Sequence, residues 1–98
     1  MEKLLDLGWK ECSLDMAWKH YSKPVPKLNI WLHVDKRINH HEWSFSISYW
    51  GSPLEDDIYV DFDITVENLC AFEVLLMEIQ SFDKEKIYGL IENQKVSK

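Results

Sequence analysis

Residues 43–50 read WSFSISYW, and large apolar side chains alternate there with serines. Successive side chains of a β-strand point to opposite faces, so this alternation predicts a strand with one apolar and one polar face. The same alternation recurs in residues 28–35 and 58–66. Strands of parallel sheets are usually apolar on both faces, so three half-polar strands predict an antiparallel sheet. The apolar positions are Leu28, Ile30, Leu32 and Val34, then Trp43, Phe45, Ile47 and Tyr49, and finally Ile58, Val60, Phe62, Ile64 and Val66.

The connections between these strands favour a meander. Residues 35–42 are typical of a polar hairpin loop in which Asn39 is available for a positive φ, and the Gly-Ser-Pro sequence at residues 51–53 ends the second strand. The simplest order places residues 43–50 in the middle. We predict three strands, with four or five as the alternative.

Two C-terminal helices are predicted to cover the apolar face. Thr65 can cap the first helix, and Asp83 can cap the second, which Gly89 weakens. Both segments have apolar residues at helical spacing, which makes the chain an α+β protein. The apolar stripes are Leu69, Phe72, Leu76 and Ile79 in the first helix, and Ile87, Leu90 and Ile91 in the second.

The first 23 residues fit two patterns. Leu14, Ala17, Trp18 and Tyr21 recur at helical spacing behind a Ser13 cap, whereas Cys12, Leu14, Met16 and Trp18 alternate as in a strand. We favour an N-terminal helical segment. Prolines at positions 24 and 26 then enforce an extended entry into the first strand.

Length and composition predict one cytoplasmic domain, residues 1–98. The 98 residues are 46% apolar, which is enough for a single core. The sequence has no apolar run long enough for a membrane span and no secretory apolar segment at its start. Two cysteines do not make a disulfide framework, and Cys70 lies in an apolar run typical of a buried thiol.

Negative charge is concentrated in one part of the chain. The net charge is −6, yet residues 54–85 carry ten acidic residues against one basic residue. Nucleic-acid binding relies on Lys and Arg at phosphates, so we expect no direct nucleic-acid contact. A platform of stacked aromatics for RNA is disfavoured for the same reason. The charge favours a basic protein partner instead.

Candidate ligands for a metal ion are present but dispersed. His33 and Asp35 share a strand face with Asp61 and Asp63, but the middle strand separates them, and adjacent His40 and His41 tend to point apart. The sequence contains no nucleophile elbow, phosphate loop or zinc-protease motif. We therefore predict no cofactor, no metal and no enzymatic activity. A metal-binding or hydrolytic domain that uses this His and Asp group is the alternative.

Large aromatic residues on the polar face of the sheet are the main candidates for a binding surface. Trp31, Trp50 and Tyr59 fall on that face, and Trp and Tyr often anchor interfaces. The alternative is that the N-terminal segment, with Trp9 and Trp18, covers them. The predicted partner-binding residues are Trp31, Trp50 and Tyr59 together with the acidic residues Glu55, Asp56, Asp57, Asp61 and Asp63.

The sequence as a whole favours a small acidic protein-binding domain. We expect an inhibitor or immunity-type protein, or a phage counter-defence protein, that blocks a basic, nucleic-acid-handling site on its partner. A homodimeric structural subunit is a further alternative.

Overall fold

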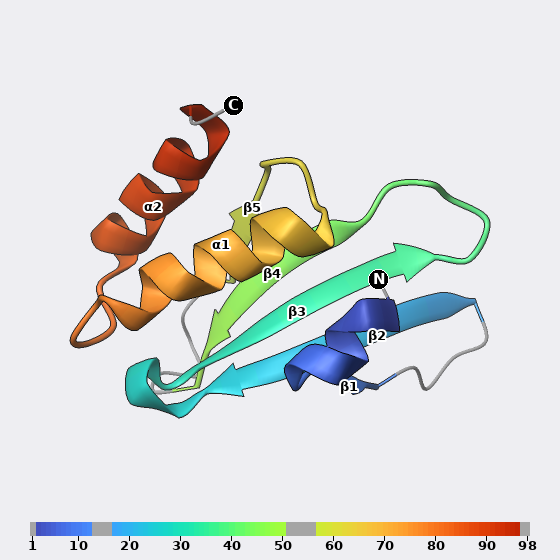
Figure 1. The fold of residues 1–98 in the computed structure, drawn as a ribbon, viewed down its shortest axis with the longest axis horizontal. Helices are drawn as coiled ribbons and strands as arrows, with labels where there is room; N and C mark the ends of the chain where they lie inside the picture. Colours follow the sequence, from blue (N-terminus) through green and yellow to red (C-terminus); the bar gives the residue numbers. More distant parts are fainter. Residues whose placement is uncertain (1, 13–16, 51–56, 97–98) are drawn as a thin grey trace.

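The chain forms a five-stranded antiparallel sheet in which every strand pairs with its neighbour in sequence (Figure 1). The computed structural model describes residues 2–12, 17–50 and 57–96. The strands are β1 (Lys10–Glu11), β2 (Trp18–Val25), β3 (Ile30–Arg37), β4 (Ser44–Tyr49) and β5 (Ile58–Val60). The predicted antiparallel meander is therefore confirmed, and β4 lies between β3 and β5 as expected.

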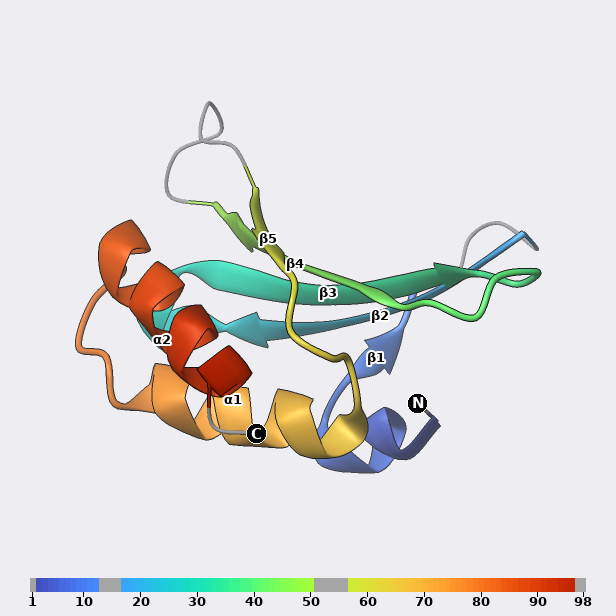
Figure 2. The same ribbon diagram turned by 90° about the horizontal axis from the view of Figure 1, so that it is seen from above.

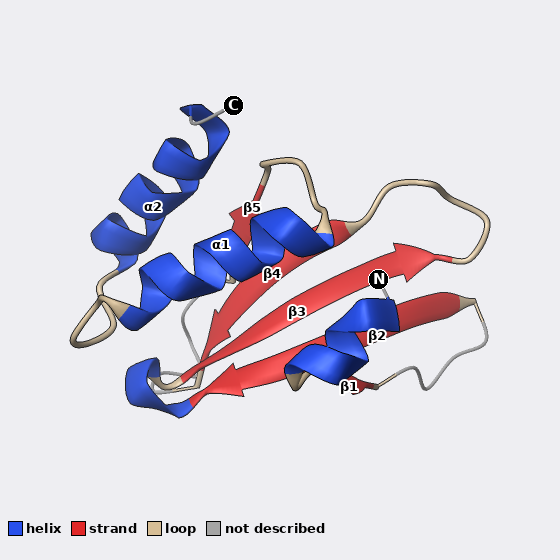
Figure 3. Cartoon of the chain, in the orientation of Figure 1, coloured by secondary structure: helices blue, strands red, loops and turns tan. Residues whose placement is uncertain are grey.

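Helices cover one face of this sheet only. The α-helices are α1 (Val66–Met77) and α2 (Lys84–Val96), and the 3₁₀-helices are η1 (Glu2–Leu7) and η2 (Pro26–Leu28). Figure 2 shows α1, α2 and η1 on the same side of the sheet, and Figure 3 separates helices from strands by colour. The α+β class is thus confirmed. No helix in the described part of the chain is long and apolar enough to span a membrane.

The core fills the space between the sheet and the helices. The predicted stripe of α1 is buried, and Phe72 and Leu76 are fully inaccessible to solvent. Phe72 packs edge-on against Phe45 of β4 and also against Phe62. Leu4 and Trp9 are buried in the same core, so the N-terminal segment covers the helix side of the sheet.

The predicted helix caps are present. The Thr65 hydroxyl accepts a hydrogen bond of 3.1 Å from the Asn68 backbone N–H, and Asp83 accepts bonds from the N–H groups of Glu85 and Lys86. These bonds satisfy donors that a helix N-terminus leaves without an intrahelical partner.

Two local predictions were wrong. The third predicted strand ends at Val60 instead of Val66, although Phe62 is still buried in the core. Among the described non-glycine residues, the positive φ lies at Asn29, with φ 56°, and not at Asn39. Asn29 ends η2 in the left-handed conformation, which reverses the chain into β3.

The preference for helix around residue 18 was also wrong, because Trp18 and Tyr21 belong to β2. The only N-terminal helix among the described residues lies earlier, at Glu2–Leu7. The inward positions of β2 include Lys23, whose ammonium group lies 2.6 Å from a carboxylate oxygen of Glu73 in α1. A charged residue at an inward position interrupts the apolar alternation that would reveal the strand. The sequence does not show that Glu73 pairs with this lysine, because the two residues lie 50 positions apart.

The two cysteines form no disulfide. Cys12 is exposed, and Cys70 is partly exposed, contrary to the prediction of a buried thiol. Cys70 lies on α1 and lines a shallow groove with Leu7 and Val74, which explains its residual exposure.

Candidate functional site

The face of the sheet opposite the helices is the candidate site, and it is called the open face below. None of the described helices lies over it (Figure 2). The alternative that the N-terminal segment covers this face was wrong, because Trp9 is buried on the helix side and Trp18 is 40% exposed. By register, the open face carries Trp18, His20, Ser22, Pro24, Trp31, His33, Asp35, Arg37, Ser44, Ser46, Ser48 and Tyr59.

Two of the predicted aromatic anchors are in contact on this face. The rings of Trp31 and Trp50 meet edge-on with centroids 5.6 Å apart. Trp50 directly follows β4, and its backbone N–H donates to the Asn29 carbonyl, which continues the β3–β4 pairing and holds the indole beside Trp31. Trp50 remains 43% exposed. An apolar surface that is fixed but accessible is suited to contact with another molecule.

The remaining aromatics extend the open face toward both edges of the sheet. Tyr59 of β5 is paired with Ser46 and is 75% exposed. At the far corner of β2, Trp18 lies under the guanidinium of Arg37, 5.4 Å from the ring centroid. Serine side chains of β4 lie between the aromatics, so the open face is amphipathic throughout.

A hydrogen-bonded chain of three side chains crosses the open face from β2 to β4. His20 Nε2 lies 3.2 Å from His33 Nδ1, and His33 Nε2 lies 2.9 Å from Ser48 Oγ. A neutral His33 that donates from Nε2 to Ser48 uses Nδ1 as an acceptor for His20. These two hydrogen bonds therefore fix the ring orientation of His33.

Burial on the open face, and then the nearby charge of His20, lower the pKa of His33 below its ordinary value of 6.5. Asp57 and Asp35 act in the opposite direction, but more weakly. His33 is accordingly neutral at pH 7, when an imidazole can both donate and accept hydrogen bonds.

The described acidic candidates lie in two places, with Asp57 apart from Asp61 and Asp63. Asp57 lies near enough to influence His33 and thus borders the open face. Asp61 pairs with Lys95 of α2 at 3.2 Å, so it faces the helix layer, and Asp63 accepts a bond from the Asn68 amide through its backbone carbonyl. Glu55 and Asp56 lie outside the described residues.

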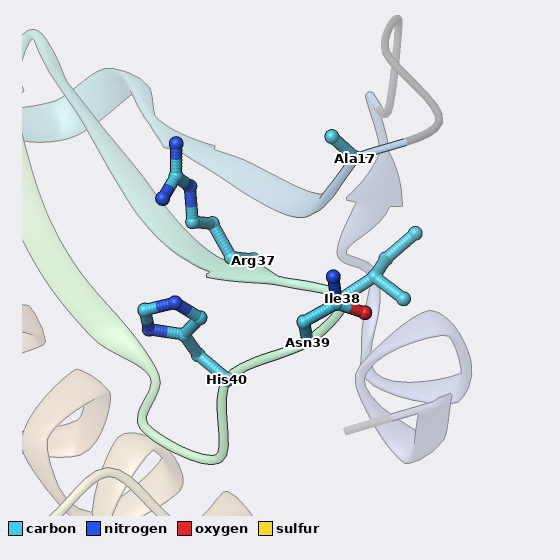
Figure 4. A pocket seen from close by; sticks show the side chains of 5 residues that line it. All are labelled: Ala17, Arg37, Ile38, Asn39 and His40. Atoms are coloured by element: carbon cyan, nitrogen blue, oxygen red, sulfur yellow. The ribbon is translucent and has the colours of Figure 1, made fainter.

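The histidine pair in the β3–β4 hairpin lies apart from the open-face histidines. His40 and His41 are both exposed. Figure 4 shows His40 at a hollow of about 400 Å³, whose lining residues include no carboxylate or nucleophile. A second hollow of similar volume brings His41 together with Asp61 and Asp63. Within the described ranges, however, no three His, Cys, Asp or Glu side chains are arranged to hold a metal ion.

Sequence reasoning missed His20 as part of the site. Residues 18–25 place Trp18, His20 and Ser22 on one face if they form a strand, and this alternation was the available signal. The contact between His20 and His33 depends on the β2–β3 register, in which His20 lies opposite Asp35.

Comparison with known proteins gave no relative. No protein family, curated protein or solved structure matches this chain. Its function must therefore be inferred from the chemistry of its own side chains.

Proposed function

We propose that this chain is a small cytoplasmic protein-binding domain, of the inhibitor or immunity type or a phage counter-defence protein, that docks its open face on a basic site of a partner protein. The observation that carries the proposal is the set of exposed aromatics on a sheet face that no described helix covers. Aromatic side chains give large contact areas at small entropic cost, which suits a docking surface.

Charge at one end of the open face supports a basic partner. Asp57 borders the face, and it belongs to a stretch of nine residues, 55–63, with five carboxylates and no basic residue. Such a field speeds the encounter with a cationic surface, and salt weakens it. A protein that handles nucleic acids has a cationic surface of this kind where it binds phosphate.

Site-specific photo-crosslinking tests the location of the interface. A photoreactive amino acid replaces Tyr59 on the open face or, as the matched control, Tyr88, which is 45% exposed on α2. We expect one basic protein from the native host's lysate to crosslink to position 59 and not to position 88. Equal crosslinking at both positions would rule out the open face as the specific interface.

Variants of the same residues give the energetic test once the partner is purified. Tyr59→Ala should weaken binding by about tenfold or more, because interface anchors commonly contribute at least ~1–2 kcal/mol. Tyr88→Ala should leave the Kd unchanged. Asp57→Lys should mainly slow association at low salt, with the difference shrinking at ~0.5 M salt. An unchanged Kd for both Tyr59→Ala and Asp57→Lys would contradict the proposal.

Self-association is the competing explanation for an exposed aromatic face. Both edge strands are short, with two residues in β1 and three in β5, which disfavours growth of the sheet by strand addition. A homodimer would therefore use the open face itself. Sedimentation equilibrium of the parent and Tyr59→Ala proteins distinguishes the two cases. If the parent is a dimer and Tyr59→Ala is a monomer, the partner of the open face is a second copy of this chain and not a foreign protein.

A further inference from the structure

We infer that His20 and His33 together chelate one divalent transition-metal ion of the class that prefers imidazole, such as Ni²⁺, Cu²⁺ or Zn²⁺, on the open face. This site shares His33 with the metal hypothesis drawn from the sequence, but it combines that residue with His20 instead of the hairpin histidines and the strand aspartates. It is also independent of the proposed partner binding, because it can be tested on the isolated protein.

The distance between the two ring nitrogens fits a chelate. His20 Nε2 and His33 Nδ1 are 3.2 Å apart. Two metal–nitrogen bonds of ~2.0–2.1 Å that end on these atoms subtend an angle of about 100° at the ion. That angle lies between the octahedral and the tetrahedral values. The ion would take the place of the shared hydrogen: the proton of His20 moves from Nε2 to Nδ1, and each ring turns so that its lone pair points at the ion.

The sheet holds these rings in place before any ion binds. His20 and His33 lie on adjacent paired strands, and their ring centroids are 5.2 Å apart. The second nitrogen of His33 is bonded to Ser48 Oγ at 2.9 Å. Metal-binding histidines almost always use their other nitrogen in this way, because the bond fixes the tautomer and the ring orientation.

Negative charge near the two rings favours a bound cation. Asp35 lies opposite His20 in the β2–β3 register and two residues from His33, on the same face of the sheet. Asp35 and Asp57 lie close enough to act on His33, and both carry negative charge toward the site. Because no three ligating side chains converge in the described ranges, water molecules would complete the coordination shell.

Titration with Ni²⁺ alone, by calorimetry and histidine-ring NMR, tests the site in protein that carries no histidine tag. We expect one ion per chain and early paramagnetic broadening of the His20 and His33 ring signals. His20→Asn and His33→Asn should each weaken binding by at least about tenfold, since the loss of an outer-shell partner alone costs ~10–100-fold. Thermal melts in chelator verify that each variant is folded.

Two matched controls use other potential ligands of the same chain. A double variant, His40→Asn with His41→Asn, removes the exposed hairpin pair and should bind Ni²⁺ like the parent. Cys12→Ser should do the same, although the Cys12 thiol lies only 3.1 Å from Ser22 Oγ on the open face. The inference is overturned if the affinity survives in both His20→Asn and His33→Asn, or if either control variant abolishes binding.

Discussion

His33 has a different environment from every other histidine in the described chain, because it contacts a second histidine, a serine and an indole. It stacks on Trp31 with centroids 6.4 Å apart. Its carboxylate neighbours only partly offset the burial that lowers its pKa. A partly buried imidazole that prefers the neutral state links the stability of the fold to pH.

The metal-free protein should lose stability as the pH falls below about 6.5. Unfolded His33 takes up a proton near its ordinary pKa of 6.5, whereas folded His33 does so only at lower pH. The unfolded state therefore binds more protons than the folded state between these two pKa values. The contribution of neutral His33 to the free energy of unfolding is complete above pH 6.5 and is lost as the pH falls through the folded-state pKa. Urea melts between pH 7.5 and 5.5 in chelator measure this decline.

His33→Asn is the control for that experiment. The variant should be less stable than the parent at pH 7.5, and the gap between the two proteins should narrow toward pH 5.5. A gap that stays constant over this range would show that His33 does not titrate differently in the folded state.

Among the helices, α1 and α2 begin at side-chain caps that the sequence predicts. The cap of α1 can be tested without touching the core. Thr65→Ala should lower the free energy of unfolding by about 1 kcal/mol, because the Asn68 N–H loses its acceptor. Thr65→Ser keeps the hydroxyl and should cost clearly less. Chemical denaturation of the three proteins measures the difference, and equal losses for Ala and Ser would mean that the threonine methyl is the important group.

Substitution by alanine should have opposite effects at Gly8, which follows η1, and at Gly89, which lies within α2. Gly89 lies inside α2, and no atom lies within 4 Å of the position that an alanine methyl would take, so Gly89→Ala should stabilise the protein by about 0.5–1 kcal/mol. Gly8 has φ +93°, so Gly8→Ala should destabilise it by about 1–2 kcal/mol. Thermal melts of both variants test the pair, and a shift in the same direction would contradict the assignment of Gly8 to the left-handed region.

Strands were predictable from sequence where their inner faces are uniformly apolar. That condition holds for β4 and for β3 as far as Val34, and both strands were predicted to within two residues of their bounds. It fails for β2, whose inner face carries Lys19 and Lys23. A lysine is acceptable at position 23 because of Glu73, a contact that only the folded chain creates.

The candidate site was predictable only in part, for a related reason. Alternation placed Trp31 and Tyr59 on the polar face, but it could not reveal that no described helix covers this face or that Asp61 turns toward Lys95. The contact between His20 and His33 could not be predicted either, because it depends on the existence of β2 and on its register with β3.

At the scale of the whole molecule, one aromatic cluster joins the two layers. Phe72 of α1 is fully buried and contacts Phe45 of β4 and Phe62. Phe72→Ala should lower the free energy of unfolding by about 3–5 kcal/mol, a large fraction of the ~5–15 kcal/mol typical of a domain. Val74→Ala, at a position of the same helix that is 64% exposed, should change it by less than about 0.5 kcal/mol. If urea melts show similar losses of stability for Phe72→Ala and Val74→Ala, Phe72 is not part of the core.

The lysines of the N-terminal half also affect the order in which the protein can fold during synthesis. Lys23 binds Glu73, and Lys27 donates to the Met77 carbonyl, each across 50 residues of sequence. At ~5–20 residues per second, the ribosome delivers these partners several seconds after the lysines emerge. The contacts of Lys23 and Lys27 with α1 therefore form only after α1 has been made, whereas β2 can pair with β3 earlier, because those two strands are close in the sequence.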